Sequence, residues 1–436
     1  MIQRYLGNKA KIISPLLDVF AEHADPGDHV VDLFSGSLTV SLAMKQAGYR
    51  VSANDSNLLS YVIGQAFLVP SKLPEVDVAL IPLIHRQRLI EQARRHVLEH
   101  VGFKESIRAG HLQEATALVA LTAWLNEVTE IDFRGTTPPY FIYDTYTEEG
   151  ANSAYRSLRG RTGRRRFFSG ANAQRIDLAL TQLRIWVRQG VLNEPVRSYL
   201  LASLMRAVEK IANTQGTFHD FPRDRWDQRA LQTINIQGLP TDPMISEVQG
   251  HAVGKEMDSR EYVRDLSPHK LLYLDPPYNF RQYSAYYFLL NLICRYTEID
   301  DLPAYFSKVT YVRGQNPDDD FNSTFCKTST FIRDMGAVMR DASADTVVVS
   351  YYTGRNHWSD FDTARSDTGL DLLSSLMTGT MFETGSLRVT EVERLNYASY
   401  GGYKARKVQE LILVANKRKD HVEATRGDDA GVPEMA

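Results

Sequence analysis

The strongest chemical pattern of the chain is the run Asp275, Pro276, Pro277 and Tyr278, which follows the apolar residues 270–274. Two successive prolines fix the backbone and remove two N–H donors, so the turn is rigid and presents the Pro276 carbonyl as a free acceptor. Asp275 and this carbonyl can hold an amino group by accepting its two hydrogens, while the Tyr278 ring stacks on the ring that carries the group. The competing interpretation is a purely structural Pro-Pro turn.

A second candidate site follows the predicted strand 29–34, where the chain enters a glycine turn at Ser35, Gly36 and Ser37. A strand that ends in such a turn and opens a helix brings backbone N–H groups close to a ligand. Asp55 ends the next predicted strand, about 20 residues further on, where a carboxylate can accept ribose hydroxyl groups. The turn alone is equally typical of any strand–helix connection, but with Asp55 it indicates a nucleoside-binding unit.

The elements that must position these residues have the order of an α/β protein. In the N-terminal part, helix, strand, helix and strand are predicted at 9–24, 29–34, 39–48 and 50–53. Further strands are predicted from apolar runs at 270–274, 346–350 and 410–414. The intervening residues 72–230 are mostly helical in pattern, which is far longer than an ordinary connection. We therefore predict an α/β fold whose Rossmann-like sheet is interrupted by a helical insertion.

Composition narrows the class of protein. The chain has 436 residues, with 50 Lys+Arg against 53 Asp+Glu, and 43% of its residues are hydrophobic. This globular composition excludes a uniformly basic, histone-like binder but allows a local basic patch. Cys294 and Cys326 match no metal-ligand spacing, so neither a disulfide scaffold nor a metal site is expected. No apolar run reaches membrane-spanning length, so we expect a cytoplasmic protein without a membrane partner.

Together, the motifs resemble those of the Dam-like, α-group N6-adenine DNA methyltransferases. The shared motifs are the Asp-Pro-Pro-Tyr run at 275–278, the turn at 34–37, and an N-terminal Arg-Tyr-Leu-Gly-Asn-Lys run at 4–9. The resemblance covers roughly residues 2–417. It implies transfer of a methyl group from S-adenosylmethionine to the N6 amine of adenine in a specific duplex DNA sequence, with base flipping. It also implies a restriction-modification or related prokaryotic or phage system, a nucleoid-associated location through DNA, and a cognate restriction endonuclease as a further partner.

The resemblance assigns roles residue by residue. The catalytic residues that it implies are Asp275, Pro276, Pro277 and Tyr278. The cofactor-binding residues that it implies are Tyr5, Gly7, Lys9, Asp32, Phe34, Gly36, Ser37, Asp55 and Asp258. Within this set, Tyr5, Gly7 and Lys9 match positions near the methionine part of the cofactor. Asp55 matches the ribose-binding acid, and Asp258 matches the acid beside the adenine ring. Leu38 departs from the family, which usually has a second glycine there, so a side chain at this position is expected to alter the approach to the methionine end.

The same resemblance implies a division of the chain. Residues 1–69 are expected to form the first part of the catalytic α/β domain, with the cofactor motifs. Residues 70–244 are expected to form the helical target-recognition and DNA-binding insertion. Residues 245–417 would complete the catalytic domain with the Asp-Pro-Pro-Tyr motif, and residues 418–436, which are charged and contain Gly and Pro, are predicted to be a disordered tail.

Double-stranded DNA is the expected partner, and two segments are candidates for contacting it. Residues 156–168 contain six arginines and no acid, which indicates phosphate contact, although a solvated loop is the competing interpretation. A run this polar is not expected to lie in a core. Polar residues after the catalytic motif are placed to touch the flipped nucleotide or its neighbours. The candidate DNA-binding residues are Arg159, Arg161, Arg164, Arg165, Arg166, Asn279, Arg281, Gln282 and Tyr283.

Three alternatives stay open at this point. N4-cytosine DNA methylation uses the same amine chemistry, and pocket size, which decides between the two bases, cannot be read from the sequence. Methylation of RNA or of a protein amide is disfavoured, because an Asn in place of Asp275 would favour those substrates. From another class, the chain could be a non-catalytic DNA-binding module with a degenerate methyltransferase fold, against which the intact motif at 275–278 argues.

Overall fold

The computed structural model describes residues 5–133, 137–214, 217–218, 225–352, 356–358, 367–395 and 407–427. The chain divides into two compact units, each assembled from segments that are far apart in the sequence. The sheet unit comprises Gly7–Ser56, Val248–Gln282 and Phe321–Ala436. The helical unit comprises Met1–Leu6, Asn57–Glu247 and Tyr283–Asp320. The helical unit therefore takes in residues 57–69 and 283–320, which the sequence had suggested as parts of the α/β domain.

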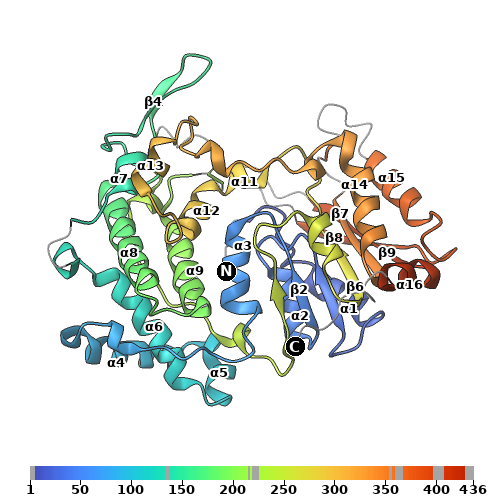
Figure 1. The fold of residues 1–436 in the computed structure, drawn as a ribbon, viewed down its shortest axis with the longest axis horizontal. Helices are drawn as coiled ribbons and strands as arrows, with labels where there is room; N and C mark the ends of the chain where they lie inside the picture. Colours follow the sequence, from blue (N-terminus) through green and yellow to red (C-terminus); the bar gives the residue numbers. More distant parts are fainter. Residues whose placement is uncertain are drawn as a thin grey trace. The chain divides into compact units, whose positions relative to one another are not determined.

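The sheet unit is built on a mainly parallel β-sheet (Figure 1). Its strands are β1 (His29–Asp32), β2 (Arg50–Ala53), β5 (Ala252–Val253), β6 (His269–Leu274), β7 (Ala344–Tyr352), β8 (Arg388–Leu395) and β9 (Lys407–Asn416). Within the described residues the strand order is β5-β2-β1-β6-β7-β9-β8. The five strands from β5 to β7 are parallel, and β9 runs antiparallel to both β7 and β8. The predicted α/β class is confirmed.

The strand order creates a switch point between β1 and β6. From β1 the chain builds outward to β2 and β5, and it then returns to the other side of β1 to add β6 and β7. In open α/β sheets, ligands bind outside the carboxyl ends of the strands at such a point. The register pairs Asp32 with Tyr273, so the segments that follow β1 and β6 leave the same edge of the sheet side by side.

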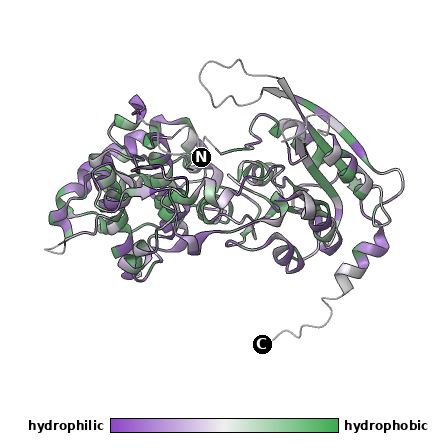
Figure 2. Cartoon of the chain, turned by 90° about the horizontal axis from the view of Figure 1, so that it is seen from above, coloured by the Kyte–Doolittle hydropathy of each residue, from purple (hydrophilic) through white to green (hydrophobic). Residues whose placement is uncertain are grey.

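Helices cover both faces of this sheet. They are α1 (Ile13–Ala21), α2 (Thr39–Gln46), α10 (Ser259–Arg264), α14 (Thr328–Asp341), α15 (Thr368–Met377) and α16 (Lys419–Gly427). On one face Leu272 and Val347 pack in a buried core with Met335 of α14. On the other face Phe20 of α1 meets the Tyr273 ring edge-on, with 5.4 Å between centroids. Because helices cover both faces of the sheet, its central parallel strands bury apolar side chains such as Val31, Leu272 and Val347, and Figure 2 shows green along these strands.

The helical unit consists mainly of packed helices. They are α3 (Leu58–Ile63), α4 (Leu83–Glu99), α5 (Lys104–Arg108), α6 (Leu112–Glu127), α7 (Phe141–Tyr146), α8 (Gly170–Arg188), α9 (Glu194–Ile211), α11 (Tyr283–Tyr286), α12 (Phe288–Arg295) and α13 (Leu302–Ser307). Helix α9 packs against α3, α6, α8 and α12 and is buried along most of its length. Asn193 caps it, because its side-chain oxygen accepts the Val196 N–H at 3.0 Å. A hairpin of β3 (Ala154–Arg156) and β4 (Thr162–Arg164) projects from this unit (Figure 1).

The sequence predicted the long elements better than the edges of the sheet. Strands β1, β2, β6, β7 and β9 and helices α1 and α2 are confirmed, as is the mostly helical character of residues 72–230. Strands β5 and β8 were missed, since β5 has two residues and β8 is an edge strand that carries charged side chains. The prediction of disorder from residue 418 is wrong for its first part, where α16 forms. The Arg418 N–H bonds to the Met381 carbonyl at 3.0 Å, and Val422 is buried, while residues 428–436 lie outside the described residues. No helix of the described residues is long and apolar enough to cross a membrane.

Candidate active site

The turn after β1 and the acid after β2 come together as the sequence suggested. Asp32 is the last residue of β1, and the buried Gly36 has a left-handed backbone with φ of 50°. The N–H of Gly36 donates to Asp55 Oδ2 at 2.9 Å, so the carboxylate lies directly against the turn. Asn54, which the sequence patterns had not singled out, is fully buried beside Asp55 and donates to the Met257 carbonyl at 3.0 Å. In the sequence, the signal for Asn54 is the polar pair Asn54-Asp55 that directly follows the predicted strand 50–53.

Two buried polar groups at this turn have hydrogen-bonding atoms that no described residue satisfies. Asp32 Oδ2 accepts from the Ser41 hydroxyl at 2.6 Å, but Asp32 Oδ1 and the Ser35 hydroxyl have no partner among the described residues. Burial raises the pKa of Asp32 to about 7, and the nearby charges of Asp275 and Asp55 add to the effect. Unpartnered buried groups are rare in native proteins. Their concentration here fits a ligand that brings hydrogen-bond donors and positive charge.

Leu38 explains why the family prefers a glycine at its position. It has φ of 58° and ψ of 19° and stands at the N-cap of α2. A left-handed backbone costs a non-glycine residue about 1–2 kcal/mol. The Leu38 side chain is completely buried, and burial of a leucine contributes a stabilisation of similar size, roughly 1.5–3 kcal/mol. The departure from glycine is therefore accommodated by packing within the sheet unit.

The Asp-Pro-Pro-Tyr motif, the candidate catalytic motif, begins where β6 ends. Asp275 is half-buried, and the side chain of Tyr278 is buried, with its ring centroid 5.4 Å from that of Tyr352 on β7. The Tyr278 carbonyl accepts the N–H of His357 at 2.8 Å. These contacts hold the segment after β6 against the neighbouring strand. A carboxylate and an aromatic ring thus stand at the switch point, next to the turn that follows β1.

Lys9 reaches the catalytic motif from the N-terminal segment. Its ammonium is buried and lies 2.9 Å from Asp275 Oδ1 and 2.5 Å from Glu410 Oε1, and 5.3 Å from the centroid of the Tyr278 ring. Burial by itself would lower the pKa of Lys9, but the charges of Asp275, Tyr278 and Glu410 raise it well above its ordinary value. The ammonium is therefore charged. The resemblance implies a place for Lys9 near the methionine part of the cofactor, and the structure places it against the Asp275 carboxylate.

Glu410 is the member of this cluster that the sequence patterns did not reveal. It lies on β9 and is completely buried, and its Oε1 also accepts from the Ser350 hydroxyl at 3.2 Å. A fully buried glutamate is uncommon unless it is paired. The available signal was a glutamate directly before the apolar run 411–414, but nothing local identified its partner, which is 401 positions away.

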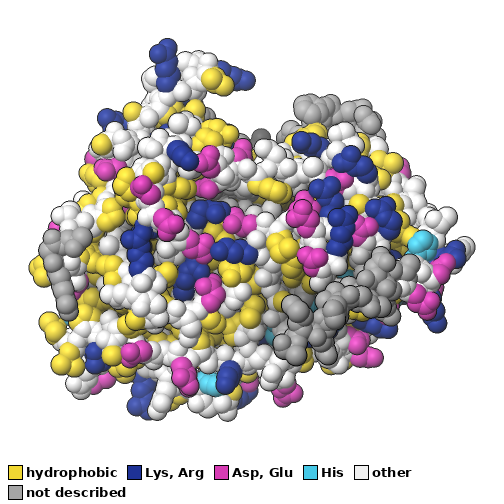
Figure 3. Space-filling model, in the orientation of Figure 1, with side chains coloured by type: hydrophobic (Ala, Val, Ile, Leu, Met, Phe, Trp, Pro, Cys, Tyr) yellow, Lys and Arg dark blue, Asp and Glu magenta, His cyan; other side chains and the backbone are white. Residues whose placement is uncertain are grey.

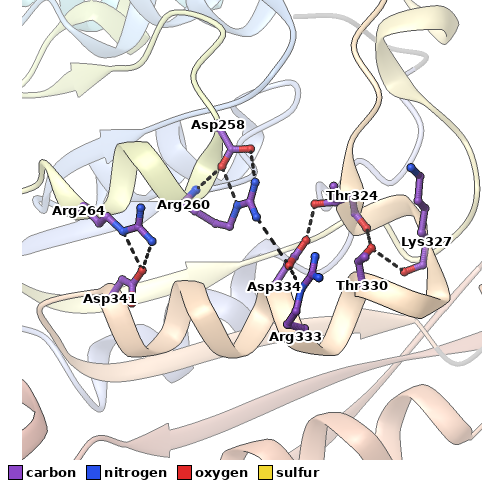
Figure 4. A network of polar contacts seen from close by, with 9 residues as sticks. All are labelled: Asp258, Arg260, Arg264, Thr324, Lys327, Thr330, Arg333, Asp334 and Asp341. Carbon is purple, nitrogen blue, oxygen red and sulfur yellow. Dashed lines mark hydrogen bonds and ion pairs between the residues drawn. The ribbon is translucent and has the colours of Figure 1, made fainter.

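Asp258, which the resemblance places beside the adenine ring of the cofactor, stands at the start of α10. It caps α10, and its Oδ1 accepts from the Arg260 N–H at 2.9 Å and from Arg260 Nε at 3.1 Å, while its Oδ2 accepts from Arg260 Nη2 at 3.2 Å (Figure 4). Burial opposes ionisation, but these bonds to Arg260 lower the pKa of Asp258 below its ordinary value. The carboxylate borders a cavity of about 460 Å³ between α10 and α14. The arginines that line this cavity are Arg260, Arg264, Arg333 and Arg340.

The remaining cofactor candidates fall in both units. Gly7, in the sheet unit, has φ of 78°, a conformation that favours glycine. Tyr5 belongs to the helical unit and stacks on Tyr287 with 4.5 Å between centroids and an interplanar angle of 7°. Phe34 meets Phe325 edge-on at 4.9 Å, and the Ser37 hydroxyl is 2.9 Å from that of Thr39. These two residues shape the turn after β1.

The polar residues after the catalytic motif are partly engaged with the protein itself. Gln282 Oε1 accepts the Ser323 N–H at 2.8 Å, and Asn279 Oδ1 accepts the N–H of the exposed Arg281 at 3.0 Å. Tyr283 begins α11 in the helical unit, with its ring centroid 5.9 Å from that of Tyr5. Asn279 and Gln282 thus fix the backbone beside the motif, while the Arg281 side chain extends toward solvent.

The arginine run separates into two groups. Arg165 is 4% exposed, and its guanidinium donates to the carbonyls of Asn152, Tyr311 and Val312 at 2.8, 3.2 and 3.1 Å. The prediction that this run avoids the core is therefore wrong for Arg165, because the carbonyls replace its water. Burial also lowers the pKa of Arg165 below its ordinary value.

The neighbours of Arg165 also bind protein groups, whereas the hairpin does not bury its arginines. Arg164 donates to the Gly150 carbonyl at 2.9 Å, and Arg166 pairs with Glu148 at 2.7 Å. Arg159 and Arg161 are exposed at the β3–β4 hairpin, where Figure 3 shows basic side chains at the projecting tip. The first group builds the base of the hairpin, and the second is exposed at its tip.

Comparison with known proteins supplies the class. The family model of the D12 class N6 adenine-specific DNA methyltransferases matches residues 5–107 and 138–328. The chain therefore belongs to this family, and the resemblance inferred from its motifs is confirmed.

Similar individual proteins are modification enzymes. The chain is 26% identical over 416 residues to the modification methylase LlaI of Lactococcus lactis subsp. lactis, covering 95% of this chain and 55% of that protein. It is 27% identical over 351 residues to the type II methyltransferase M.FokI of Planomicrobium okeanokoites, covering 80% and 44%. It is 30% identical over 195 residues to the type II methyltransferase M.NlaIII of Neisseria lactamica, covering 44% and 53%. The chain spans about half the length of these curated relatives.

Proposed function

We propose that this protein transfers a methyl group from S-adenosylmethionine to the N6 amine of adenine in a specific sequence of duplex DNA. The observation that carries the proposal is the Asp-Pro-Pro-Tyr run 275–278 at the carboxyl end of β6, beside the turn after β1, in a chain of the D12 family. The names of the relatives, modification methylases and type II methyltransferases, support a role in restriction-modification, and we propose a cognate endonuclease as a further partner. We assign the sheet unit a Rossmann-like catalytic role and the helical unit target recognition.

The residues at the turn after β1 fit the proposed cofactor. S-adenosylmethionine presents an ammonium group and ribose hydroxyls, and when bound it supplies a methyl group on a positively charged sulfur. Asp32 Oδ1, which is buried and has no partner among the described residues, suits the ammonium. Asp55 suits the ribose hydroxyls, and Gly36 permits the close approach of a ligand to the backbone. We propose that Asp258 lies beside the adenine ring of the cofactor, because its carboxylate oxygens, which accept from Arg260, can accept further hydrogen bonds.

The catalytic motif would orient a poorly nucleophilic amine. The lone pair of the adenine amine is delocalised into the ring, so the site must hold the amine with that lone pair directed at the methyl group. We propose that Asp275 and the Pro276 carbonyl accept the two amine hydrogens while Tyr278 stacks on the base. Lys9 keeps Asp275 ionised and therefore a strong acceptor. Because these groups cannot reach a stacked base, the adenine must leave the duplex.

DNA binding would rest on the exposed basic residues. We propose that Arg159 and Arg161 of the hairpin contact phosphates, since they are exposed and flank Gly160, whose φ is 77°. Arg281, together with Asn279, is proposed to lie near the flipped nucleotide. The role suggested for Arg165 is not retained, because its guanidinium is buried against carbonyl groups.

The experiment that tests this function uses a host without DNA methylation of its own. The chain is expressed there, and modified bases are mapped by single-molecule sequencing, with Asp275→Ala as the blank. We expect N6-methyladenine at one recurring sequence. N4-methylcytosine would support the alternative amine substrate instead, and unmodified DNA from a folded, cofactor-binding protein would contradict the proposal.

A further inference from the structure

We propose that Glu410 is a positioning residue for methyl transfer, which shares the Lys9 ammonium with Asp275 so that the catalytic cluster keeps a net negative charge. The inference rests on the proposed function and deepens it. Glu410 lies outside the residues 5–107 and 138–328 that the family model matches. Its place in the cluster follows from the contacts within the sheet unit.

The geometry makes Lys9 a bridge between two carboxylates. The side chains of Lys9 and Glu410 are 2% and 0% exposed, whereas that of Asp275 is 16% exposed. Lys9 Nζ lies 2.9 Å from Asp275 Oδ1 and 2.5 Å from Glu410 Oε1. Ser350 on β7 donates its hydroxyl to the same Glu410 oxygen at 3.2 Å. Lys9 and Glu410 are therefore enclosed, and Asp275 is the member of the cluster that faces outward.

The charges of the cluster do not cancel. One ammonium and two carboxylates, those of Lys9, Asp275 and Glu410, sum to a single negative charge. Among the described residues, the other titratable groups that act on Lys9 or Asp275 are Tyr273, Tyr278 and Asp32. None of these adds a positive charge. Burying a second carboxylate is costly, and a Lys9–Asp275 pair alone would already neutralise Lys9. An excess of negative charge at this point therefore calls for a role other than pairing Lys9.

The chemistry of the proposed reaction supplies such a role. The amine nitrogen forms a bond to the methyl carbon as the methyl–sulfur bond breaks, and the electron pair of the broken bond stays on sulfur. The nitrogen gains one positive charge, and one of its protons then leaves to water. Fixed negative charge beside the nitrogen stabilises this developing positive charge in the transition state. Because Glu410 takes up part of the Lys9 charge, Asp275 stays a stronger acceptor for the amine than it would be in an isolated pair with Lys9.

A purely structural role for Glu410 makes a different prediction, which two substitutions can separate. Glu410→Gln keeps the size of the side chain and removes its charge. Glu410→Asp keeps the charge and shortens the side chain. Glu391→Gln, at an exposed position of the neighbouring strand β8, is the control for removing a negative charge from the same hairpin. The single-turnover rate of methyl transfer to DNA is measured against pH for each full chain, with cofactor affinity as the check of folding.

If the charge of Glu410 matters, Glu410→Gln lowers the rate of methyl transfer by roughly 10- to 100-fold. The rate of Glu410→Asp should be well above that of Glu410→Gln, and the rate of Glu391→Gln should equal that of the wild type. The acid limb of the pH profile should also move to lower pH in Glu410→Gln, because Lys9 then acts on Asp275 alone. The proposal would be overturned if the rate of Glu410→Gln were within twofold of the wild type or above the rate of Glu410→Asp. It would also be overturned if the acid limb of Glu410→Gln stayed at the wild-type pH.

Loss of cofactor binding in Glu410→Gln and loss of methyl transfer in the wild type can be distinguished from these results. If Glu410→Gln loses cofactor binding, Glu410→Asp alone decides, because retained charge predicts a wild-type acid limb and a shifted limb contradicts it. If the wild type binds cofactor but transfers no methyl group to DNA, the proposed function fails, and the inference that rests on it fails with it.

Discussion

Lys9 in the sheet unit and the arginines of residues 156–168 in the helical unit are all basic, yet their surroundings differ. Lys9 is buried between carboxylates that keep it charged and fixed. The arginine run divides, so that Arg165 is buried against carbonyls while Arg159 and Arg161 remain exposed. Burial and partners, more than residue type, therefore separate a basic residue that pairs with the Asp275 carboxylate from one that builds the fold and from those that stay exposed.

The largest expected effect is on the chemical step. Asp275→Ala removes the proposed acceptor of the amine and should lower the methyl-transfer rate by roughly 100-fold or more. Cofactor affinity should change little, because Lys9 keeps Glu410 as a partner and the turn after β1 is intact. Single-turnover rates and calorimetry of cofactor binding check this. A variant with activity within twofold of the wild type would remove Asp275 from the catalytic site.

The second expected effect is on stability. Arg165→Ala leaves the carbonyls of Asn152, Tyr311 and Val312 without their donor, and we expect a loss of roughly 2–4 kcal/mol in the free energy of unfolding. Denaturant titration of the full chain measures it. The exposed Arg161→Ala is the matched control and should change stability by less than about 0.5 kcal/mol. Equal stabilities for the two variants would contradict the division of the arginine run.

A third prediction concerns pH and Asp32. Its pKa of about 7 means that the carboxyl is largely neutral below that pH, so binding of a cationic cofactor should strengthen as pH rises toward 7. The free energy of unfolding should depend on pH in the opposite direction. The raised pKa contributes stability that is complete below about pH 4 and is lost as pH rises to about 7. Calorimetry across this window, with Asp32→Asn as the control, should show a slope in the wild type that the variant lacks. The same slope in both would assign the effect to another group.

The smallest expected effect is on DNA affinity. Replacing Arg159 and Arg161 with alanine should weaken binding to all duplex sequences about equally, and the salt slope should fall by roughly 0.9 for each phosphate that the variant no longer neutralises. The rate of the chemical step at saturating DNA should not change. Binding isotherms at several salt concentrations test this. Retained affinity for random duplex with loss of discrimination between sites would instead make the hairpin a base-reading element.

Local sequence patterns predicted those parts of the site that local structure decides. Asp32 ends β1, Gly36 lies in the turn after β1, and Asp275 follows β6. The carboxyl ends of adjacent parallel strands necessarily meet, so the proximity of these residues could be inferred. The place of Glu410 in the site could not be inferred, because its partner Lys9 comes from the opposite end of the chain. Arg165 was misjudged for the same reason, since the Tyr311 and Val312 carbonyls that hold it are distant in sequence. Patterns of polarity do not reveal tertiary partners that replace water.

The most direct test of the central claim is the identity of the methylated nucleoside. Duplex DNA that contains the mapped sequence is incubated with the purified chain and labelled S-adenosylmethionine, and its nucleosides are then separated and identified by mass spectrometry. The proposed roles of Asp275 and Tyr278 predict label in N6-methyldeoxyadenosine. The wild type should produce more of this labelled nucleoside than Asp275→Ala does. Label in N4-methylcytosine, or equal label in adenine with the wild type and with Asp275→Ala, would contradict them.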